Sequence, residues 1–447
     1  MTRYHARWVL PVTAPPLRDG TVVVESGRVS WVGLRSEAPL VPGTDDVELG
    51  DAILLPGLVN AHIHLDLAAF SGALNGESFF AWVRAIVDAS VEVMDERARA
   101  DAALFSVVNQ LEHGVTTMAD TSPSPAGFDA MVACGARGIA YLEAFGPDPA
   151  QCDGAVRDVR NRTEAARREE TSLVRVGVSP HAPYSVSDAL YRAVADYARD
   201  ESLPVAVHIA ESADESLLVA EGRGEFAEYL RGRRIPVGSR ASSPIALLDR
   251  TRVLTTRPVC IHAVRAGADD VLRLADNGAG VAHCPLSNRW FSHGDAPVDA
   301  FRAHRIPVGV GTDSAASNDL LHVLGEAGEA AGESLDARDR IALATVEGAR
   351  AIGLDDGTGT LAPGAPADLA AFAIRDLGEA DRDPARYLLA HCVAAPAMLT
   401  VVGGVVRARN GRAAAHDEAL DERVHTLAAR IRAWATAAGW RGASPPS

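Results

Sequence analysis

The 447-residue chain contains no lysine, because all 43 of its basic residues are arginine. The sequence therefore excludes Schiff-base chemistry, pyridoxal phosphate attachment, P-loop phosphate binding and metal bridging by a carboxylated lysine, all of which need a lysine side chain. Cysteine is also scarce: five are scattered along the chain without a CxxC pair. Neither a disulfide framework nor a cysteine-type zinc site is expected, and a reducing cytoplasm fits this pattern.

Long hydrophobic runs and an excess of positive charge are absent as well. No run approaches the ~18 apolar residues of a membrane span, and prolines interrupt the N-terminal stretch where a signal peptide would be apolar. The net charge is −16, which argues against a basic nucleic-acid-binding face. We expect a cytoplasmic globular protein that binds neither membrane nor nucleic acid.

Short apolar runs recur along the middle of the chain, and amphipathic segments such as 188–201 and 269–277 separate several of them. Eight buried strands that alternate with helices predict a (β/α)8 TIM barrel. The eight runs are ILLPGLVNAHIHL, GVTTMADTS, RGIAYLEAFG, LVRVGVSPHAPY, PVAVHIAES, RPVCIHAVR, AGVAHCPLSN and PVGVGTDSAA.

Both chain ends carry short strand patterns instead, and VVVESGRVSWVG has the form of a hairpin. We expect these strands to form one small β-sandwich beside the barrel. The predicted division is 1–55 and 361–412 for the sandwich, 56–360 for the barrel, and 413–447 for a terminal amphipathic helix over 418–440 and a tail.

Polar residues that could carry chemistry follow the apolar runs, at the end where barrel enzymes build their active sites. His62 and His64 lie two apart on the first strand and share one face. His208 ends the fifth strand and Asp313 the eighth, which barrel closure brings beside the first. Three imidazoles and one carboxylate suit one divalent cation: zinc is the expected metal, and Fe²⁺ also fits.

The segments PGLVNAHIHLD, SPHAPYSVS, HIAE, HCPLSN and GTDSAASN resemble the amidohydrolase superfamily. Within it they are similar to the mononuclear branch that contains cytosine, guanine and S-adenosylhomocysteine deaminases and triazine hydrolases. The resemblance spans residues 51–377. The binuclear branches of the superfamily use a carboxylated lysine on the fourth strand. This chain has no lysine, and its fourth strand ends in His181, so the resemblance implies a mononuclear centre.

The resemblance implies that His62, His64, His208 and Asp313 bind the metal. It further implies that Glu211 delivers a proton to a substrate ring nitrogen, while His262 steadies the attacking water. Asp313, as a metal ligand, can also accept the proton of that water and pass it to the leaving group. A buried Glu211 would keep the raised pKa that such a proton donor needs.

Substrate contacts are predicted at three positions: His181, which the resemblance puts over the substrate, and Ser287 and Asn288, which either line the pocket or only end a strand. His293 could also face the substrate. The aromatic residues after the first and seventh strands either form a wall for a substrate ring or pack between helix and barrel. These are Phe79, Phe80, Trp82, Trp290 and Phe291, and Arg84 and Arg289 could meet a carboxylate.

The implied function is hydrolytic deamination of a heteroaromatic ring amine. The motifs are most similar to bacterial aminodeoxyfutalosine deaminases of menaquinone synthesis, which implies the 6-amino group of an extended adenine nucleoside. Adenosine or S-adenosylhomocysteine deamination, guanine or cytosine deamination and triazine dechlorination stay open. A catalytically inactive amidohydrolase-like scaffold is the non-enzymatic alternative, although no ligand is missing, and a homodimer is the default assembly.

Overall fold

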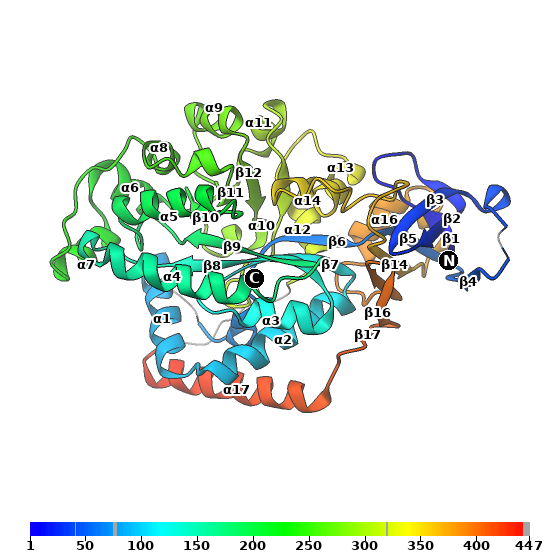
Figure 1. The fold of residues 1–447 in the computed structure, drawn as a ribbon, viewed down its shortest axis with the longest axis horizontal. Coiled ribbons are helices and arrows are strands. Elements are labelled where there is room, and N and C mark those ends of the chain that lie inside the picture. Colours follow the sequence, from blue (N-terminus) through cyan, green and yellow to red (C-terminus); the bar gives the residue numbers. More distant parts are fainter. Residues whose placement is uncertain (41, 75–77, 319–320, 441–447) are drawn as a thin grey trace.

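The computed structural model describes residues 1–40, 42–74, 78–318 and 321–440. A barrel of parallel strands fills most of this structure, and a smaller sheet built from both chain ends lies beside it (Figure 1). The barrel strands are β6 (Leu58–Ile63), β7 (Val115–Ser122), β8 (Arg137–Ala144), β9 (Val174–Pro180), β10 (Ala206–Ile209), β11 (Val259–His262), β12 (Gly280–His283) and β13 (Val308–Val310).

The eight strands form two parallel sheets in chain order, from β6 to β9 and from β10 to β13. Isolated parallel bridges join the sheets on both sides: Val178 pairs with Val205, and Ile63 pairs with Asp313 just after β13. Strand order and direction are therefore continuous around the ring. This confirms the predicted (β/α)8 fold.

Helices cover the outside of the barrel, and their ends follow from local capping. In α5, the Ser187 side chain accepts a hydrogen bond from the amide of Leu190, and the helix buries one face against the barrel. The barrel helices are α1 (Phe79–Glu92), α2 (Glu96–Glu112), α3 (Ala126–Cys134), α4 (Cys152–Arg167), α5 (Asp188–Asp200), α6 (Ala213–Glu221), α7 (Glu225–Gly232), α8 (Pro244–Arg250), α9 (Ala268–Asn277), α10 (Pro285–Trp290), α11 (Val298–Ala303), α12 (Val323–Glu329), α13 (Ala337–Leu343) and α14 (Val346–Ala351).

The smaller domain is one nine-stranded sheet in which the two chain ends meet, as predicted. The expected hairpin is present between β2 and β3, with Glu25 opposite Arg28, and β5 pairs antiparallel with β14. Its strands are β1 (Thr2–Val9), β2 (Leu17–Glu25), β3 (Arg28–Leu34), β4 (Asp45–Glu48), β5 (Ala52–Pro56), β14 (Leu369–Ala373), β15 (Leu399–Val402), β16 (Val405–Arg409) and β17 (Arg412–Ala413).

Strand β5 connects the two domains because both of its faces are buried. Ala52 and Leu54 belong to the core of the small sheet, whereas Ile53 and Leu55 belong to the main barrel core. Successive side chains of a strand point to opposite faces, so one strand serves two cores. The near-continuous apolar sequence of this segment follows from that position.

The first apolar run is not one barrel strand, as we had expected, but two strands separated at Gly57. A Cβ atom at Gly57 would lie 2.2 Å from the Thr116 side chain, so the chain passes close to β7 here. The break leaves ILLP in the small sheet and LVNAHI in the barrel. We retain the division at 55/56, 360/361 and 412/413 as a proposal; the first and third of these points lie inside β5 and β17.

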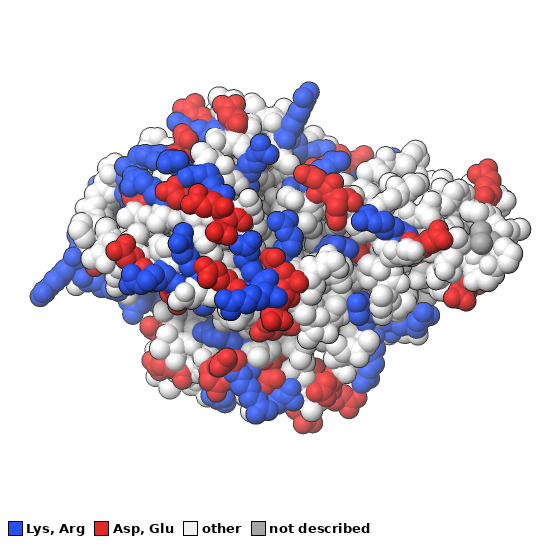
Figure 2. All heavy atoms as spheres, viewed as in Figure 1, with Lys and Arg blue, Asp and Glu red and all other residues white. Residues whose placement is uncertain are grey.

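The C-terminal region contains the predicted amphipathic helix, α17 (Glu418–Ala437), which runs below α1 and α2 in Figure 1. Arg423 pairs with Asp101 of α2 at 2.9 Å. The sequence did not indicate the two short helices α15 (Leu377–Ala380) and α16 (Pro384–His391). Figure 2 shows acidic and basic side chains intermixed over the barrel on the face in view. Among the described residues, no helix is both long and apolar enough to cross a membrane.

Candidate metal centre and active site

The candidate site lies at the carboxyl ends of the barrel strands, where several residues other than glycine have left-handed backbone. Ala210, His262 and Asp313 follow or end β10, β11 and β13, with φ angles of 52°, 71° and 58°. Left-handed backbone is unfavourable for residues other than glycine and persists only where the surrounding structure enforces it. The fold thus holds these turns in place next to the predicted functional residues.

The four residues predicted to bind metal converge here. The Nε2 atoms of His62 and His64 lie 3.4 Å and 3.5 Å from Oδ1 of Asp313. The His208 ring lies 4.8 Å from that of His62 and 5.3 Å from that of His64, measured between centroids. The side chains at the ends of β6, β10 and β13, the first, fifth and eighth barrel strands, therefore lie close together, as the sequence spacing predicted.

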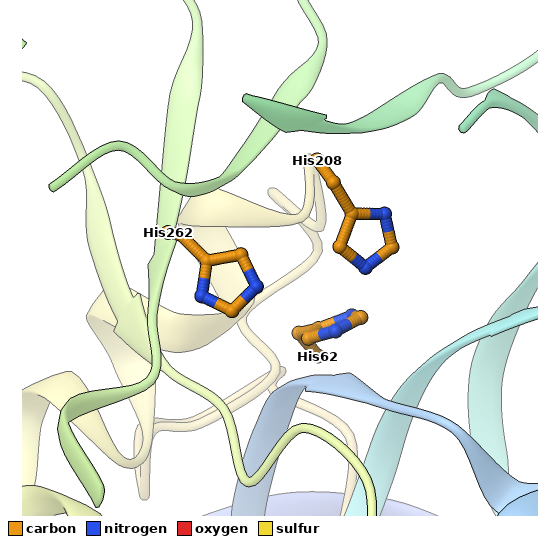
Figure 3. A group of neighbouring side chains, drawn as sticks. All are labelled: His62, His208 and His262. Atoms are coloured by element: carbon orange, nitrogen blue, oxygen red, sulfur yellow. The ribbon is translucent and has the colours of Figure 1, made fainter. Parts of the chain in front are cut away.

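The donor set fits a divalent cation. Burial lowers the pKa of His62 to about 4 and that of His208 well below its usual value, so both rings are neutral at pH 7, as metal ligands must be. His62 Nε2 and His208 Nδ1 are buried without a hydrogen-bond partner in the described structure. Figure 3 shows the rings of His62, His208 and His262 turned toward a common space. We propose that His62, His64, His208 and Asp313 hold Zn²⁺ or Fe²⁺.

Hydrogen bonds orient the Asp313 carboxylate within this set. Its Oδ2 accepts hydrogen bonds from the hydroxyls of Ser287 at 2.6 Å and Ser317 at 3.1 Å. Burial acts to raise the pKa of Asp313, but the 3.4 Å contact with His62 and the electrostatic influence of His262 and His64 hold the pKa well below its usual value. Asp313 is therefore a carboxylate with one oxygen tied to serines and the other directed at His62 and His64.

Glu211 and His262, the two other predicted catalytic residues, face each other beside the metal ligands. Oε1 of Glu211 lies 3.7 Å from Nε2 of His262, whose Nδ1 lies 3.0 Å from the side-chain oxygen of Asn288. Since that oxygen can only accept, the proton of a neutral His262 sits on Nδ1 and its Nε2 faces Glu211. Burial raises the pKa of Glu211 well above its usual range, with further contributions from Asp313 and Glu215.

The position of Glu211 is set by the next turn of the chain. The amides of Ala210 and Glu211 donate to the two carboxylate oxygens of Glu215, at 2.8 and 2.9 Å. This clamp holds the left-handed turn at Ala210, and only 4% of the surface of Glu211 is exposed. Glu211 is thus not a solvated helix start but a buried acid at a fixed position.

The site opens into a cavity of about 490 Å³, a size typical of small-molecule sites. The metal ligands other than His62 line its inner end together with Glu211 and His262. His181 also lines it and lies 2.7 Å from the Ser185 hydroxyl through Nδ1. Ser287 and Asn288, predicted to contact substrate, are not among the residues lining the cavity; they hydrogen-bond to Asp313 and His262 instead. We propose supporting roles for both.

Three other predictions can be compared with these positions. Phe79, Phe80 and Trp82 line the cavity, whereas Trp290 and Phe291 do not, and Phe291 packs on Phe79 at 5.2 Å between ring centroids. Arg289 pairs with Glu329 at the surface, 2.7 Å apart, and is likewise absent from the lining. Trp290, Phe291 and Arg289 therefore belong to helix packing and the surface rather than to the cavity.

From the sequence, His293 was named only as a residue that could face the substrate, and Glu143 was missed. Nε2 of His293 lies 3.7 Å from Glu211 Oε1, because the loop after α10 folds back over the site. Glu143, at the end of β8, lines the cavity with its Oε1 buried and without a hydrogen-bond partner. The pattern that identified the other strand ends, a polar residue after an apolar run, also fits Glu143 in GIAYLEAFG.

Residues 53–413 match the model of the amidohydrolase family. The chain belongs to this family. A 5-methylthioadenosine/S-adenosylhomocysteine deaminase of Symbiobacterium thermophilum is 30% identical over 380 residues, or 81% of this chain and 82% of that protein. An aminodeoxyfutalosine deaminase of Deinococcus radiodurans is 31% identical over 315 residues, covering 68% of this chain and 74% of the relative.

Solved structures agree on the fold. An adenosine deaminase from Xanthomonas campestris with bound zinc superposes with a TM-score of 0.83 at 24% identity, covering 97% of this chain and 98% of that one. The family relationship confirms the predicted amidohydrolase and its hydrolytic enzyme class. Among the described residues, His62, His64 and Asp313 form one of the groups whose possible ligand atoms lie within 4.8 Å of one another, and His62, His208 and His262 form another.

Proposed function

We propose that this amidohydrolase is a metal-dependent deaminase that removes the 6-amino group of an adenine nucleoside with a bulky 5′ extension, best exemplified by aminodeoxyfutalosine of menaquinone synthesis. The observation that carries the reaction type is Glu211, a buried acid with a raised pKa that faces the cavity next to the four candidate metal ligands. Such an acid keeps its proton to a higher pH than an ordinary glutamate and can donate it to a ring nitrogen.

The residues divide the reaction between them. A divalent cation held by His62, His64, His208 and Asp313 would lower the pKa of a bound water towards ~7. Glu211 protonates the ring nitrogen, so the adjacent amidine carbon accepts water without building up negative charge. Asp313 takes one proton of the attacking water and passes it to the amino group, which leaves as ammonia. The remaining hydroxyl proton returns to Glu211, so that a ring carbonyl forms and the acid is restored. His262, fixed by Asn288, holds the attacking oxygen on the side facing Glu211.

The adenine preference rests on the relatives and on the shape of the cavity. Both curated relatives are named for adenine nucleosides that carry a 5′ substituent. Beyond the histidine-lined inner end, the cavity continues between apolar and aromatic side chains of α1 and α7. This outer part provides room for an extension past the nucleoside. We propose that His181, whose ring lies 4.9 Å from that of His208 and 5.7 Å from that of Tyr184 between centroids, contacts the nucleoside itself.

Steady-state kinetics on adenosine, S-adenosylhomocysteine, 5′-methylthioadenosine and aminodeoxyfutalosine test this proposal, with ammonia release as the readout. We expect kcat/KM to be highest for aminodeoxyfutalosine, because remote contacts made by the extension help to position the ring. Guanine, cytosine and a chlorotriazine serve as competing substrates. If one of them exceeds all four nucleosides by more than about tenfold in kcat/KM, the proposed substrate class is wrong.

A further inference from the structure

The outer part of the cavity combines an apolar wall with two arginines that have little or no acidic partner. Three arginines line the cavity, namely Arg84, Arg99 and Arg233. Arg99 is paired with the buried Asp66 at 2.7 Å. Arg84 and Arg233 lack such a buried partner, and their surroundings indicate that they bind a ligand.

Arg233, at the end of α7, forms neither an ion pair nor a side-chain hydrogen bond with any described residue. Arg84, on α1, has one acidic neighbour, Asp88, at 3.5 Å, with both side chains 40% or more exposed. A pair of that length and exposure is worth little. In a chain with 59 acidic and 43 basic residues, two weakly compensated arginines at a cavity stand out.

Both guanidinium groups lie on the same aromatic side chain. The Cζ atom of Arg84 is 4.6 Å, and that of Arg233 is 5.6 Å, from the ring centroid of Tyr229. Tyr229 packs in turn on Phe80 of α1, at 5.6 Å between centroids. The tyrosine ring therefore positions two positive charges from helices that are far apart in sequence.

The apolar wall next to these charges is largely aromatic. Phe80 and Phe226 lie edge to face at 5.2 Å, and Tyr184 stacks on Phe226 at 4.3 Å. Flat rings gain from such edge and face contacts. A planar guanidinium can bind a carboxylate through two parallel hydrogen bonds. An aromatic ring that ends in a carboxylate fits both features.

We propose that Arg84, Tyr229 and Arg233 form an anion subsite that binds a carboxylate at the far end of the substrate, on an aromatic group held between α1 and α7. This inference rests on the proposed function and narrows its substrate class. The subsite separates such substrates from nucleosides with a neutral 5′ group, because an uncharged terminus leaves the two arginines without a partner.

The test uses two matched 5′-extended adenine nucleosides that differ at one position, an aryl carboxylate and the corresponding aryl carboxamide. For the wild-type protein we expect kcat/KM to favour the carboxylate by roughly 10- to 100-fold, the range for hydrogen bonds to a charged group. In Arg84→Gln/Arg233→Gln this ratio should fall to within about threefold. Higher ionic strength should lower the wild-type ratio, since the subsite is partly exposed.

Arg234→Gln is the matched control, because Arg234 is an exposed neighbour that does not line the cavity. It removes the same charge from the same helix end and should keep the wild-type ratio. A wild-type ratio near one, with both nucleosides deaminated, overturns the subsite while the deaminase function stands. Calorimetric titration with both compounds gives the same ratio from binding. If neither compound is deaminated but the binding ratio is retained, the proposed function is wrong and the subsite holds.

Discussion

The two ends of the cavity differ in how their side chains are held. At the inner end, the groups that face the cavity are buried and tied to a second layer: Asp313 to two serines, His262 to Asn288, and the Glu211 turn to Glu215. At the outer end, Arg84 is partly exposed and Arg233 is exposed, and both guanidinium groups lie over the ring of Tyr229. The side chains at the inner end are therefore held in a fixed geometry, whereas those at the outer end are free to contact the substrate.

This difference teaches where substitutions should act. Groups that are locked by several buried hydrogen bonds are positioned before substrate arrives, which is the condition for stabilising a transition state. Exposed groups on helices adjust to the ligand and contribute to binding. Changes at the inner end should therefore lower kcat or remove the metal, and changes at the outer end should act mostly through substrate recognition.

The largest effect should come from removing a metal ligand. His208→Ala should lose the metal and the activity together, because three of the four ligands leave an incomplete site. Elemental analysis of the purified protein should give one divalent cation per wild-type chain and little in the variant. The control is His283→Ala, another buried strand-end histidine outside the ligand set, which should keep its metal. Two firmly bound metals in the wild-type chain would contradict the single site.

Glu211→Gln should separate chemistry from metal binding. Glutamine keeps the shape of the side chain but removes the proton that the ring nitrogen requires, so kcat should fall by at least ~10²-fold. The metal content should stay at the wild-type value. A variant that retained nearly wild-type kcat would show that the proton comes from another group, and His293, 3.7 Å from Glu211, would be the first to examine.

A smaller effect on metal affinity is expected from a residue that orients a proposed metal ligand without binding the metal itself. Ser287→Ala removes the 2.6 Å hydrogen bond to Asp313 and leaves that of Ser317 in place. Groups that orient a metal ligand typically contribute 10- to 100-fold to metal affinity or activity. Competition with a chelator measures the affinity, and Ser216→Ala in α6 is the control, since Ser216 bonds only to its own helix backbone. Equal metal affinity in the two variants would argue against the supporting role.

The contrast between the ends also explains what the sequence could predict. The inner end could be predicted from the sequence because its residues directly follow apolar strands. The parallel strands of a barrel bring such positions together regardless of the conformation of the loops. The motifs around His62, His208 and Asp313 therefore predicted both fold and convergence. The sequence placed Ser287 near the site but did not show that its hydroxyl donates to Asp313, because the two residues lie 26 positions apart in the chain.

The outer end could not be predicted in the same way. Its residues come from α1 and α7, more than a hundred residues apart, and no barrel rule fixes how two surface helices face each other. From the sequence, the aromatic residues at 79–82 and at 290–291 were equally plausible as cavity lining, yet only those at 79–82 line the cavity. The split of the first apolar run at Gly57 was hidden for a related reason, because a strand buried on both faces has no alternating pattern.

The smallest predicted effect compares those two aromatic segments directly. Phe80→Leu removes a ring that lines the cavity and packs on Phe226 and Tyr229. Aromatic pairs contribute ~0.5–1.5 kcal/mol beyond their buried area, so KM for an aryl-extended nucleoside should rise by about 2- to 13-fold. Because leucine leaves the inner end untouched, kcat should change less than KM.

Trp290→Leu is the matched change in the other segment, at a half-buried aromatic residue outside the cavity lining. It should leave both kcat and KM within about twofold of wild type, the range expected of a substitution remote from substrate. Adenosine, which lacks the extension, provides the internal reference: Phe80→Leu should affect it less than the extended nucleoside. If the two substitutions raise KM equally, or if adenosine suffers as much as the extended nucleoside, the outer end acts through the stability of the fold and not through contact with the extension.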